Sequence, residues 1–418
     1  MIEVLKNAFK VPELRKKVLF TLAMLFVFRI GVHVPVPGID RTVIENLVNS
    51  GQLLGFFDVI SGGAFKKFSV FAMSITPYVN ASIILQLLAV VIPSLEKLSK
   101  DPDGRKKIAS YTRYFTVVLA FIQAIGISVG LQSALITPGW TSVLLISLSL
   151  TAGTAFLMWL GELINDKGIG NGISIIIFAG IVSRLPSGIY TIFASLKAGT
   201  TNILVVLLIA VAAILMVAAV VCLNEGQRRI PVQYAKRVVG RKVYGGQSTH
   251  IPLKVNQAGV IPIIFAMTLL MFPGTIASWF PNSPIASTVS AVFDFNKVWY
   301  QIIYALLIVF FTFFYSAITL NVIDIADNMK KYGGFIPGLR PGRPTSDYLA
   351  KISSRITLAG AIFLACIAVI PTLLMKMTSL SLYLGSTSLL IVVGVALDTM
   401  KQMESQLMMR NYQGFLKK

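Results

Sequence analysis

The sequence predicts an all-α membrane protein, with ten transmembrane helices in two inverted halves of five helices and one short re-entrant helix. Composition is the first indication, because 55% of the 418 residues are hydrophobic and only 13% are charged. Soluble proteins of average composition carry about a quarter charged residues. The second indication is a series of long apolar runs, and the third is the uneven distribution of Lys and Arg between them.

Ten apolar runs approach the length of about 20 residues that is needed to cross roughly 30 Å of hydrocarbon. Backbone polar groups in lipid must be paired within the segment, so each run is predicted to be a helix. The first run follows a basic start but lacks a small-residue cleavage site, which favours a retained span over a signal peptide. The runs cover residues 18–36, 75–93, 114–134, 141–164, 172–193, 202–223, 257–280, 298–323, 356–375 and 382–400.

The runs divide the chain into an N-terminal segment (1–17), a half with spans one to five (18–200), a half with spans six to ten (201–403) and a tail (404–418). An odd number of spans in each half gives the two halves opposite orientations in the membrane. In this plan the functional path lies at the interface of the halves.

A weak internal repeat supports the two halves. Residues 74–85 open the second span and residues 259–270 open the seventh, and Pro, Ala and Leu coincide at three of the twelve aligned positions. Apolar helices resemble one another by composition, so these identities carry little weight alone. They gain weight because the second and seventh spans are the corresponding members of the two halves.

The Lys and Arg residues predict the orientation of the chain. Cytoplasmic connections are enriched in Lys and Arg near the ends of spans. Six segments hold 29 of the 37 basic residues and are therefore predicted to be cytoplasmic, together with both chain ends: 1–17, 94–113, 165–171, 224–255, 328–355 and 401–418. The segments 224–255 and 328–355 are long, polar and interrupted by Gly, which is typical of loops that present a binding surface.

Residues 53–72 do not fit a spanning helix. Their apolar pieces are short, and they are interrupted by Ser-Gly-Gly at 61–63 and by two lysines at 66–67. Irregular backbone at membrane depth is tolerated only where protein surrounds it or where it lines a water-filled cavity. The pattern leaves two alternatives, an amphipathic loop at the membrane interface and a short re-entrant helix in a cavity.

No sequence motif points to an enzyme, a metal site or a cofactor. His-Glu-x-x-His and the P-loop pattern are both absent from the sequence. Cys222 and Cys366 lie within apolar runs, where buried small side chains are expected, and their number and spacing suggest no disulfide framework. We therefore expect no cofactor and no enzymatic activity.

Ionisable residues weigh against an ion-coupled transporter, because such proteins usually place charged groups near the bilayer midplane. Arg29 is the one plausible charge within the membrane, and pairing with a neighbouring span or a carbonyl group would explain it. The acidic residues nearest the spans cluster toward their cytoplasmic ends: Glu162, Asp166, Asp324, Asp327 and Asp398. The broken segment and the long basic loops favour a passive channel over a transporter or a membrane enzyme.

Aliphatic side chains recur at helical spacing on several spans. They are Ile75 and Val79 on the second span, Ile173 and Ile177 on the fifth, Ile261 and Ile264 on the seventh, and Ile391 on the tenth. In membrane proteins such residues usually pack against neighbours or face lipid. The alternative is a constriction, because an aliphatic ring excludes hydrated ions by dewetting while its flexible side chains can yield to a wider object.

Arg340 lies in a loop that Pro and Gly residues at 337, 338, 341, 342 and 344 stiffen and bend. Such a loop can hold Arg340 and Arg343 away from the membrane. The planar guanidinium suits carboxylates of a protein partner or phosphates of RNA. The alternative is that these arginines only set the orientation of the chain.

At several stretches the sequence closely resembles the SecY family, the channel subunits of bacterial protein translocons. The resemblance covers nearly the whole chain in order. It rests on SGGA at 61–64, PYVNASIILQLL at 77–88, GIGNGIS at 168–174, QRRI at 227–230, YAKR at 234–237, QSTH at 247–250, PLKVN at 252–256, GFIPGLRPG at 334–342 and TSLLI at 387–391.

The resemblance implies a protein-conducting channel, with an hourglass pore between two five-span halves that opens sideways between the second and seventh spans. Secretory proteins would cross the cytoplasmic membrane of a bacterium, and membrane-protein helices would leave laterally into lipid. The implied partners are the small membrane subunits SecE and SecG, the motor ATPase SecA, the ribosome, unfolded precursors with signal sequences, and membrane lipid.

The resemblance also implies roles for particular residues. The aliphatic residues named above form the pore ring, and residues 55–72 form the plug region. The plug itself comprises Phe56, Phe57, Asp58, Val59, Ile60, Ser61, Gly62, Gly63 and Ala64. The lateral gate includes Asn80, Gln86, Gln123 and Asn256. Docking of the motor or the ribosome involves Arg228, Arg229, Lys236, Arg237, Arg340 and Arg343.

Overall fold

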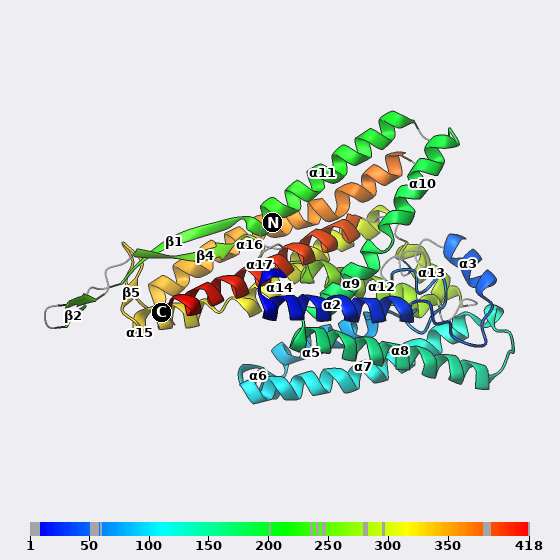
Figure 1. Ribbon diagram of the computed structural model, residues 1–418, viewed down its shortest axis with the longest axis horizontal. Coiled ribbons are helices and arrows are strands. Elements are labelled where there is room, and N and C mark those ends of the chain that lie inside the picture. Colours follow the sequence, from blue (N-terminus) through cyan, green and yellow to red (C-terminus); the bar gives the residue numbers. More distant parts are fainter. Residues whose placement is uncertain are drawn as a thin grey trace.

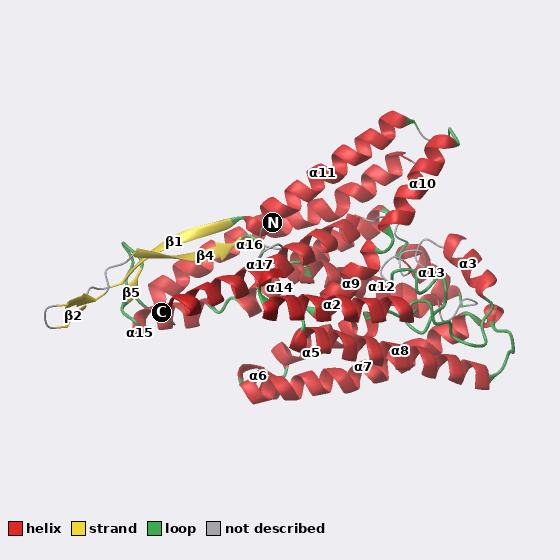
Figure 2. Ribbon diagram, viewed as in Figure 1, coloured by secondary structure: helices red, strands yellow, loops and turns green. Residues whose placement is uncertain are grey.

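Most of the described part of the chain is helical (Figure 2). The computed structural model describes residues 9–50, 58, 61–199, 202–234, 237–239, 242–244, 248–278, 283–294, 297–378 and 386–416. Its helices confirm the predicted helical membrane fold.

Helices follow one another closely in residues 12–225. They are α2 (Pro12–Gly31), α3 (Arg41–Ser50), α5 (Thr76–Val91), α6 (Pro93–Lys100), α7 (Pro102–Gly130), the 3-10 turn η1 (Gln132–Ala134), α8 (Trp140–Lys167), α9 (Gly172–Val182), α10 (Leu185–Lys197) and α11 (Ile203–Glu225).

The remainder of the chain contains helices and short strands. They are β1 (Gln227–Tyr234), β2 (Arg237–Val239), β3 (Lys242–Tyr244), β4 (Ser248–Lys254), α12 (Ile261–Ser278), α13 (Pro284–Val292), α14 (Val298–Thr319), α15 (Val322–Lys331), β5 (Gly334–Phe335), α16 (Arg343–Thr378) and α17 (Ser386–Leu416).

Each of the ten predicted apolar runs overlaps at least one helix, and the fifth is divided between α9 and α10. Among the described residues, six helical segments are long and apolar enough to cross a membrane, or seven if α5 and α6, which are bent by 110°, count as one. The helix α12 is shorter, and α2 carries four basic residues among its 20. The count of ten spans therefore stays a prediction.

The connections gather at two opposite ends of the helical bundle (Figure 1). The helix α6, the strands, α15 and the end of α17 lie at the left end in this view. The helices α3 and α13 and the junction of α10 with α11 lie at the right end. The described parts of four segments predicted to be cytoplasmic from their Lys and Arg content, 94–113, 224–255, 328–355 and 401–418, thus lie toward one end.

Two helices begin well before the apolar runs that predict them. The helix α7 begins at Pro102, where the side chain of Asp101 accepts a hydrogen bond of 2.9 Å from Gly104 N. The helix α16 begins at Arg343, and its first turns carry the buried Leu349. An apolar run therefore marks only the part of a helix that can contact lipid, while the helix itself continues beyond it.

The strands were not predicted, and they join the two long basic loops. The strand β1 pairs antiparallel with β4, so that Gln227 is opposite Lys254, and it also pairs with β5, where Tyr234 is opposite Gly334. Along β1 the buried Ile230 and Val232 alternate with exposed residues, which is the period of a half-buried strand. A separate hairpin pairs β2 with β3.

The three-stranded sheet of β4, β1 and β5, together with α15 and the first turns of α16, is called the basal sheet below. It has its own hydrophobic core, separate from the membrane helices. The buried side chains of this core are Ile230, Val232, Leu253, Met329, Ile336 and Leu349. Residues predicted as two independent loops therefore form one packed unit, which burial of apolar surface stabilises.

The main core lies between helices of the two predicted halves. The helix α12 packs against α5 and α7, and α17 packs against α9. Buried residues from all of these helices except α7 belong to one continuous cluster. The interface at which the sequence placed the functional path is therefore closely packed.

Cys222 on α11 and Cys366 on α16 are free and exposed on the surface of the chain. The expectation that both are buried was wrong. Both lie on apolar helices, and a cysteine on such a helix is equally compatible with a surface that faces lipid. Of the 23 residues of α11, only Val220 and Leu223 are buried.

Candidate functional site

A cavity of about 240 Å³ lies between the two predicted halves and is called the central cavity below. Side chains from α5, α7, α9, α12 and α17 line it, together with Phe65, Ala72 and Met73 from the segment that precedes α5. None of the lining residues is charged. The cavity is thus an apolar space at the interface that the repeat indicated.

Five of the seven residues assigned to the pore ring line the central cavity: Ile75, Val79, Ile177, Ile264 and Ile391. All five side chains are buried. They come from four helices, two in each half, so the interface brings together residues more than 300 positions apart. Ile173 and Ile261 do not line the cavity and instead pack, partly buried, against the adjoining core.

Local sequence explains how α5 presents its two ring residues. Ile75 is the N-cap residue of α5, and Pro77 occupies one of the first two helical positions. Proline is favoured there because its fixed φ suits the helix and its missing N–H leaves no unpaired donor. Val79 follows Ile75 by four residues, so both side chains lie on the same face of the helix.

Polar side chains line part of the cavity wall. Asn80 on α5 and Gln123 on α7 are buried there, and Thr268 on α12 joins them. The hydroxyl of Thr268 donates a hydrogen bond of 2.7 Å to Ile264 O. Sequence reasoning missed Thr268, although its position four residues after Ile264 puts it on the same helical face.

The other two residues assigned to the gate lie away from the cavity. Gln86 Nε2 donates to Ser82 Oγ at 3.1 Å within α5. Asn256 Nδ2 donates to Asn224 Oδ1 at 2.9 Å and to Gly259 O at 3.0 Å. Asn256 thus holds the chain that leads into α12 next to the end of α11.

The plug assignment falls partly on residues that the structure describes. Phe56, Phe57, Val59 and Ile60 lie outside them. Asp58 is helical and buried, whereas residues 61–68 form consecutive turns. The expectation that residues 56–64 form one short helix was therefore wrong at its end. Gly62 and Gly63 have φ angles of 67° and 90°, which a helix does not allow.

Hydrogen bonds close this turn on itself. The backbone N–H of Gly63 donates to Asp58 O at 2.9 Å, and Ser61 Oγ donates to the same oxygen at 3.1 Å. Ser61 Oγ accepts from Phe65 N at 3.1 Å. The turn thus carries Phe65 into the wall of the central cavity.

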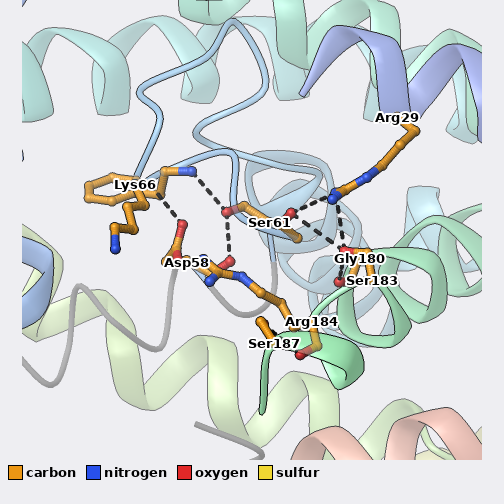
Figure 3. Close-up of polar contacts among 10 residues, drawn as sticks. Arg29, Asp58, Ser61, Lys66, Gly180, Ser183, Arg184 and Ser187 are labelled. Atoms are coloured by element: carbon orange, nitrogen blue, oxygen red, sulfur yellow. Dashed lines mark hydrogen bonds and ion pairs between the residues drawn. The ribbon is translucent and has the colours of Figure 1, made fainter. Parts of the chain in front are cut away.

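Two arginines contact the turn, one on α2 and the other between α9 and α10 (Figure 3). Arg29 donates to Gly62 O at 2.8 Å and to Ser183 Oγ at 3.1 Å, and Arg184 forms an ion pair with Asp58. The pairing expected for Arg29 is therefore present, with a carbonyl group. Partial desolvation, followed by the nearby charge of Arg29, lowers the pKa of the exposed Lys67 in the same turns.

Four of the arginines assigned to docking lie on or next to the basal sheet. Arg228 and Arg229 are exposed on β1, and Arg340 and Arg343 are exposed beyond β5. Pairing of β1 with β5 makes the two groups parts of one unit. Arg237 begins β2, and Lys236 lies outside the described residues.

The bend that carries Arg340 is fixed by backbone geometry. Gly338 and Gly342 have φ angles of 83° and 105°, values that glycine adopts readily and other residues rarely do. Thr345 Oγ1 donates a hydrogen bond of 2.8 Å to Arg340 O. The backbone of Arg340 is held while its side chain is exposed.

The described residues contain no group of three or more His, Cys, Asp or Glu side chains that could hold a metal ion. The site consists of an apolar cavity, a turn held by two arginines, and a basic surface at the far end of the bundle.

Solved structures of similar shape support the fold. "The structure of a protein conducting channel" matches with a TM-score of 0.68 and 19% identity, covering 96% of both chains. Sec61 in the canine ribosome-channel complex from the endoplasmic reticulum matches with a TM-score of 0.65 and 17% identity, again over 96% of both chains.

Sequence comparisons identify the family. Residues 69–400 match the family model SecY. The protein translocase subunit SecY of Halalkalibacterium halodurans is 49% identical, with both chains covered completely. That of Thermotoga maritima is 46% identical over 100% of this chain and 98% of the relative, and that of Escherichia coli K12 is 47% identical over 97% and 94%. The resemblance drawn from motifs is confirmed, and the chain belongs to the SecY family.

Proposed function

We propose that this chain is the channel through which unfolded secretory proteins cross a membrane and from which membrane-protein helices leave sideways into lipid. One observation carries the proposal. The central cavity lies between the two halves and is walled by aliphatic side chains from four helices, while α5 and α12 pack side by side next to it.

The cavity wall suits a seal that yields. Ile75, Val79, Ile177, Ile264 and Ile391 offer no hydrogen bonds from their side chains, so water and hydrated ions gain nothing by entering the constriction. A polypeptide in extended form brings its own bulk and displaces the side chains. Met267 and Met271, which also line the cavity, add unbranched and adaptable surface.

The lateral exit follows from which helices enclose the cavity. The helices α5 and α12 pack against each other, and both contribute apolar side chains, such as Ile83 and Leu270, to the same core. Apolar contacts between helices can be exchanged for contacts with lipid at little difference in free energy. Separation of α5 from α12 would expose the cavity to lipid, and an apolar signal sequence could take the place of one helix surface.

Energy for movement would come from partners, since the chain itself is proposed to have no catalytic activity. SecA and the ribosome would dock on the arginines of the basal sheet, and SecE and SecG would surround the helices in the membrane. Among the proteins of similar structure, Sec61 and Ssh1 are found in complexes with ribosomes. The protein would lie in the bacterial cytoplasmic membrane, with the basal sheet and both termini in the cytoplasm.

A crosslinking experiment tests the proposal. A photoreactive amino acid is placed at Ile391 in the cavity wall, and at Ile214, which is 69% exposed on α11. A secretory precursor is then stalled during translocation. Crosslinks to the precursor are expected at Ile391 and not at Ile214. Equal labelling at both positions, or labelling only at Ile214, would refute a path through the central cavity.

A further inference from the structure

The turn at residues 61–64 is fixed to the surrounding helices at two points. At the first, Arg29 in the last turn of α2 donates to Gly62 O at 2.8 Å. At the second, Arg184, which follows α9 and caps α10, forms an ion pair with Asp58 (Figure 3). Arg29 lies on α2 and Arg184 lies in the turn between α9 and α10, and the two side chains reach different groups.

The second contact involves a carboxylate that is largely removed from solvent. The side chain of Asp58 is 5% exposed and that of Arg184 is 27% exposed. The same carboxylate accepts a hydrogen bond of 2.7 Å from Lys66 N. Asp58 therefore organises the turn internally and also ties it to Arg184. Removal of one partner of a buried pair is strongly destabilising, because the other charge loses its compensation.

The turn also fits closely against α9. Gly62 has a φ of 67°, and a Cβ at this position would lie 2.8 Å from Gly180 Cα. Arg29 donates to Ser183 as well as to Gly62, so it bridges α9 and the turn. These contacts require the turn to lie against α9, and any outward movement must break them together.

We propose that the Asp58–Arg184 ion pair and the Arg29–Gly62 hydrogen bond form a clamp that sets how readily the turn at residues 61–64, and the plug with it, moves away from α9. The inference rests on the plug role of residues 56–64. The two contacts differ in kind. Arg29 binds a backbone carbonyl and holds any sequence that forms the turn, whereas the hold of Arg184 depends on the charge of Asp58.

The test measures ion leak through purified channel reconstituted in planar bilayers, with its small subunits and without precursor. The variants are Asp58→Asn, Arg184→Gln and both together. Asn keeps an oxygen that can accept from Lys66 N, so Asp58→Asn removes the charge with little change to the turn. Each single variant is expected to raise the leak several-fold, and the double variant to raise it no further than the singles.

A double variant that leaks no more than either single variant is expected when two residues act through one contact. Arg184→Lys keeps the positive charge and is expected to restore a leak near that of the unmodified chain. Lys197→Gln removes a positive charge from an exposed position of α10 and serves as the matched control, with no change expected. If Arg184→Gln fails to fold, the clamp is still tested by whether Asp58→Asn has a higher ion leak than Arg184→Lys.

A variant that lacks residues 56–64 separates the clamp from the plug. If this deletion raises the leak while Asp58→Asn and Arg184→Gln leave it unchanged, the clamp is refuted and the plug stands. If the deletion leaves the leak unchanged, the plug and the clamp both fall. Additive effects of the two single substitutions would also overturn the clamp, because they would show that the residues act separately.

Discussion

The central cavity and the basal sheet use apolar side chains in opposite ways. In the cavity wall the aliphatic side chains of Ile177, Ile264 and Ile391 surround a space, and no lining residue is charged. In the basal sheet, side chains such as Ile230 fill a small core, and the arginines stand outside it. Apolar residues are thus the working surface in one region and the scaffold in the other. Substitutions in the two regions should therefore fail in different ways.

Arg340→Glu should have the largest effect, on transport and not on folding. The side chain is exposed, so its loss removes no core contact. A charge-assisted contact with a partner contributes ~1.5–3 kcal/mol, so SecA-driven export should fall about tenfold or more. Export is measured with a reconstituted precursor assay, and folding by thermal unfolding in detergent.

Two further variants sharpen this prediction. Lysine lacks the planar fork of arginine, so Arg340→Lys should remain clearly impaired if the contact is bidentate. Lys417→Glu, at a terminal position that is predicted only to set orientation, should be nearly silent. Normal export by Arg340→Glu, or loss of the folded protein, would show that the basal sheet does not dock the motor through this residue.

Serine substitutions in the cavity wall should change the ion conductance of the channel and leave the docking of partners unaffected. Replacement of Ile75, Val79, Ile177 and Ile391 together by Ser supplies hydroxyl groups that hydrate the constriction. Single-channel recording on a background without residues 56–64 should then show a several-fold higher conductance.

The control replaces four exposed isoleucines on other helix surfaces by Ser: Ile189, Ile214, Ile302 and Ile362. These side chains do not line the cavity, so conductance should stay unchanged. Similar conductance in both quadruple variants would return the ring residues to an ordinary packing role.

Ile230→Ala should weaken the basal sheet and leave the cavity intact. Ile230 is 3% exposed in a core with six buried side chains among the described residues, and truncation of a buried Ile to Ala costs ~2–5 kcal/mol. Limited proteolysis should cut more rapidly within residues 227–254. The Arg229→Ala variant, changed at an exposed position on the same strand, should be cut at the normal rate. Higher channel conductance in Ile230→Ala would mean that the two regions are not separable.

The same comparison explains what could be predicted from the sequence. The membrane helices follow from composition and periodicity, which are local properties, and so does Val79 four residues after Ile75. The basal sheet depends on the pairing of Tyr234 with Gly334, a contact between loops 100 residues apart that no local pattern specifies. The ion pair of Asp58 with Arg184 is of the same kind, since Arg184 has no feature in the sequence that marks a partner.

The substitution Ser74→Gly should have the smallest effect, a change in thermal stability, and it tests backbone strain next to the cavity. Ser74 precedes Ile75 and has a φ of 54°, a conformation that costs a residue with a side chain about 1 kcal/mol or more. Its buried hydroxyl has no hydrogen-bond partner among the described residues. Ser74→Gly relieves both penalties, although the greater freedom of glycine in the unfolded chain offsets part of the gain. Thermal unfolding in detergent should show a small rise in Tm.

The matched control is Ser69→Gly, because Ser69 is also buried but its Oγ accepts from Phe71 N at 3.3 Å. That variant loses a contact and should lower Tm. A lower Tm for Ser74→Gly would show that the backbone before α5 is not strained.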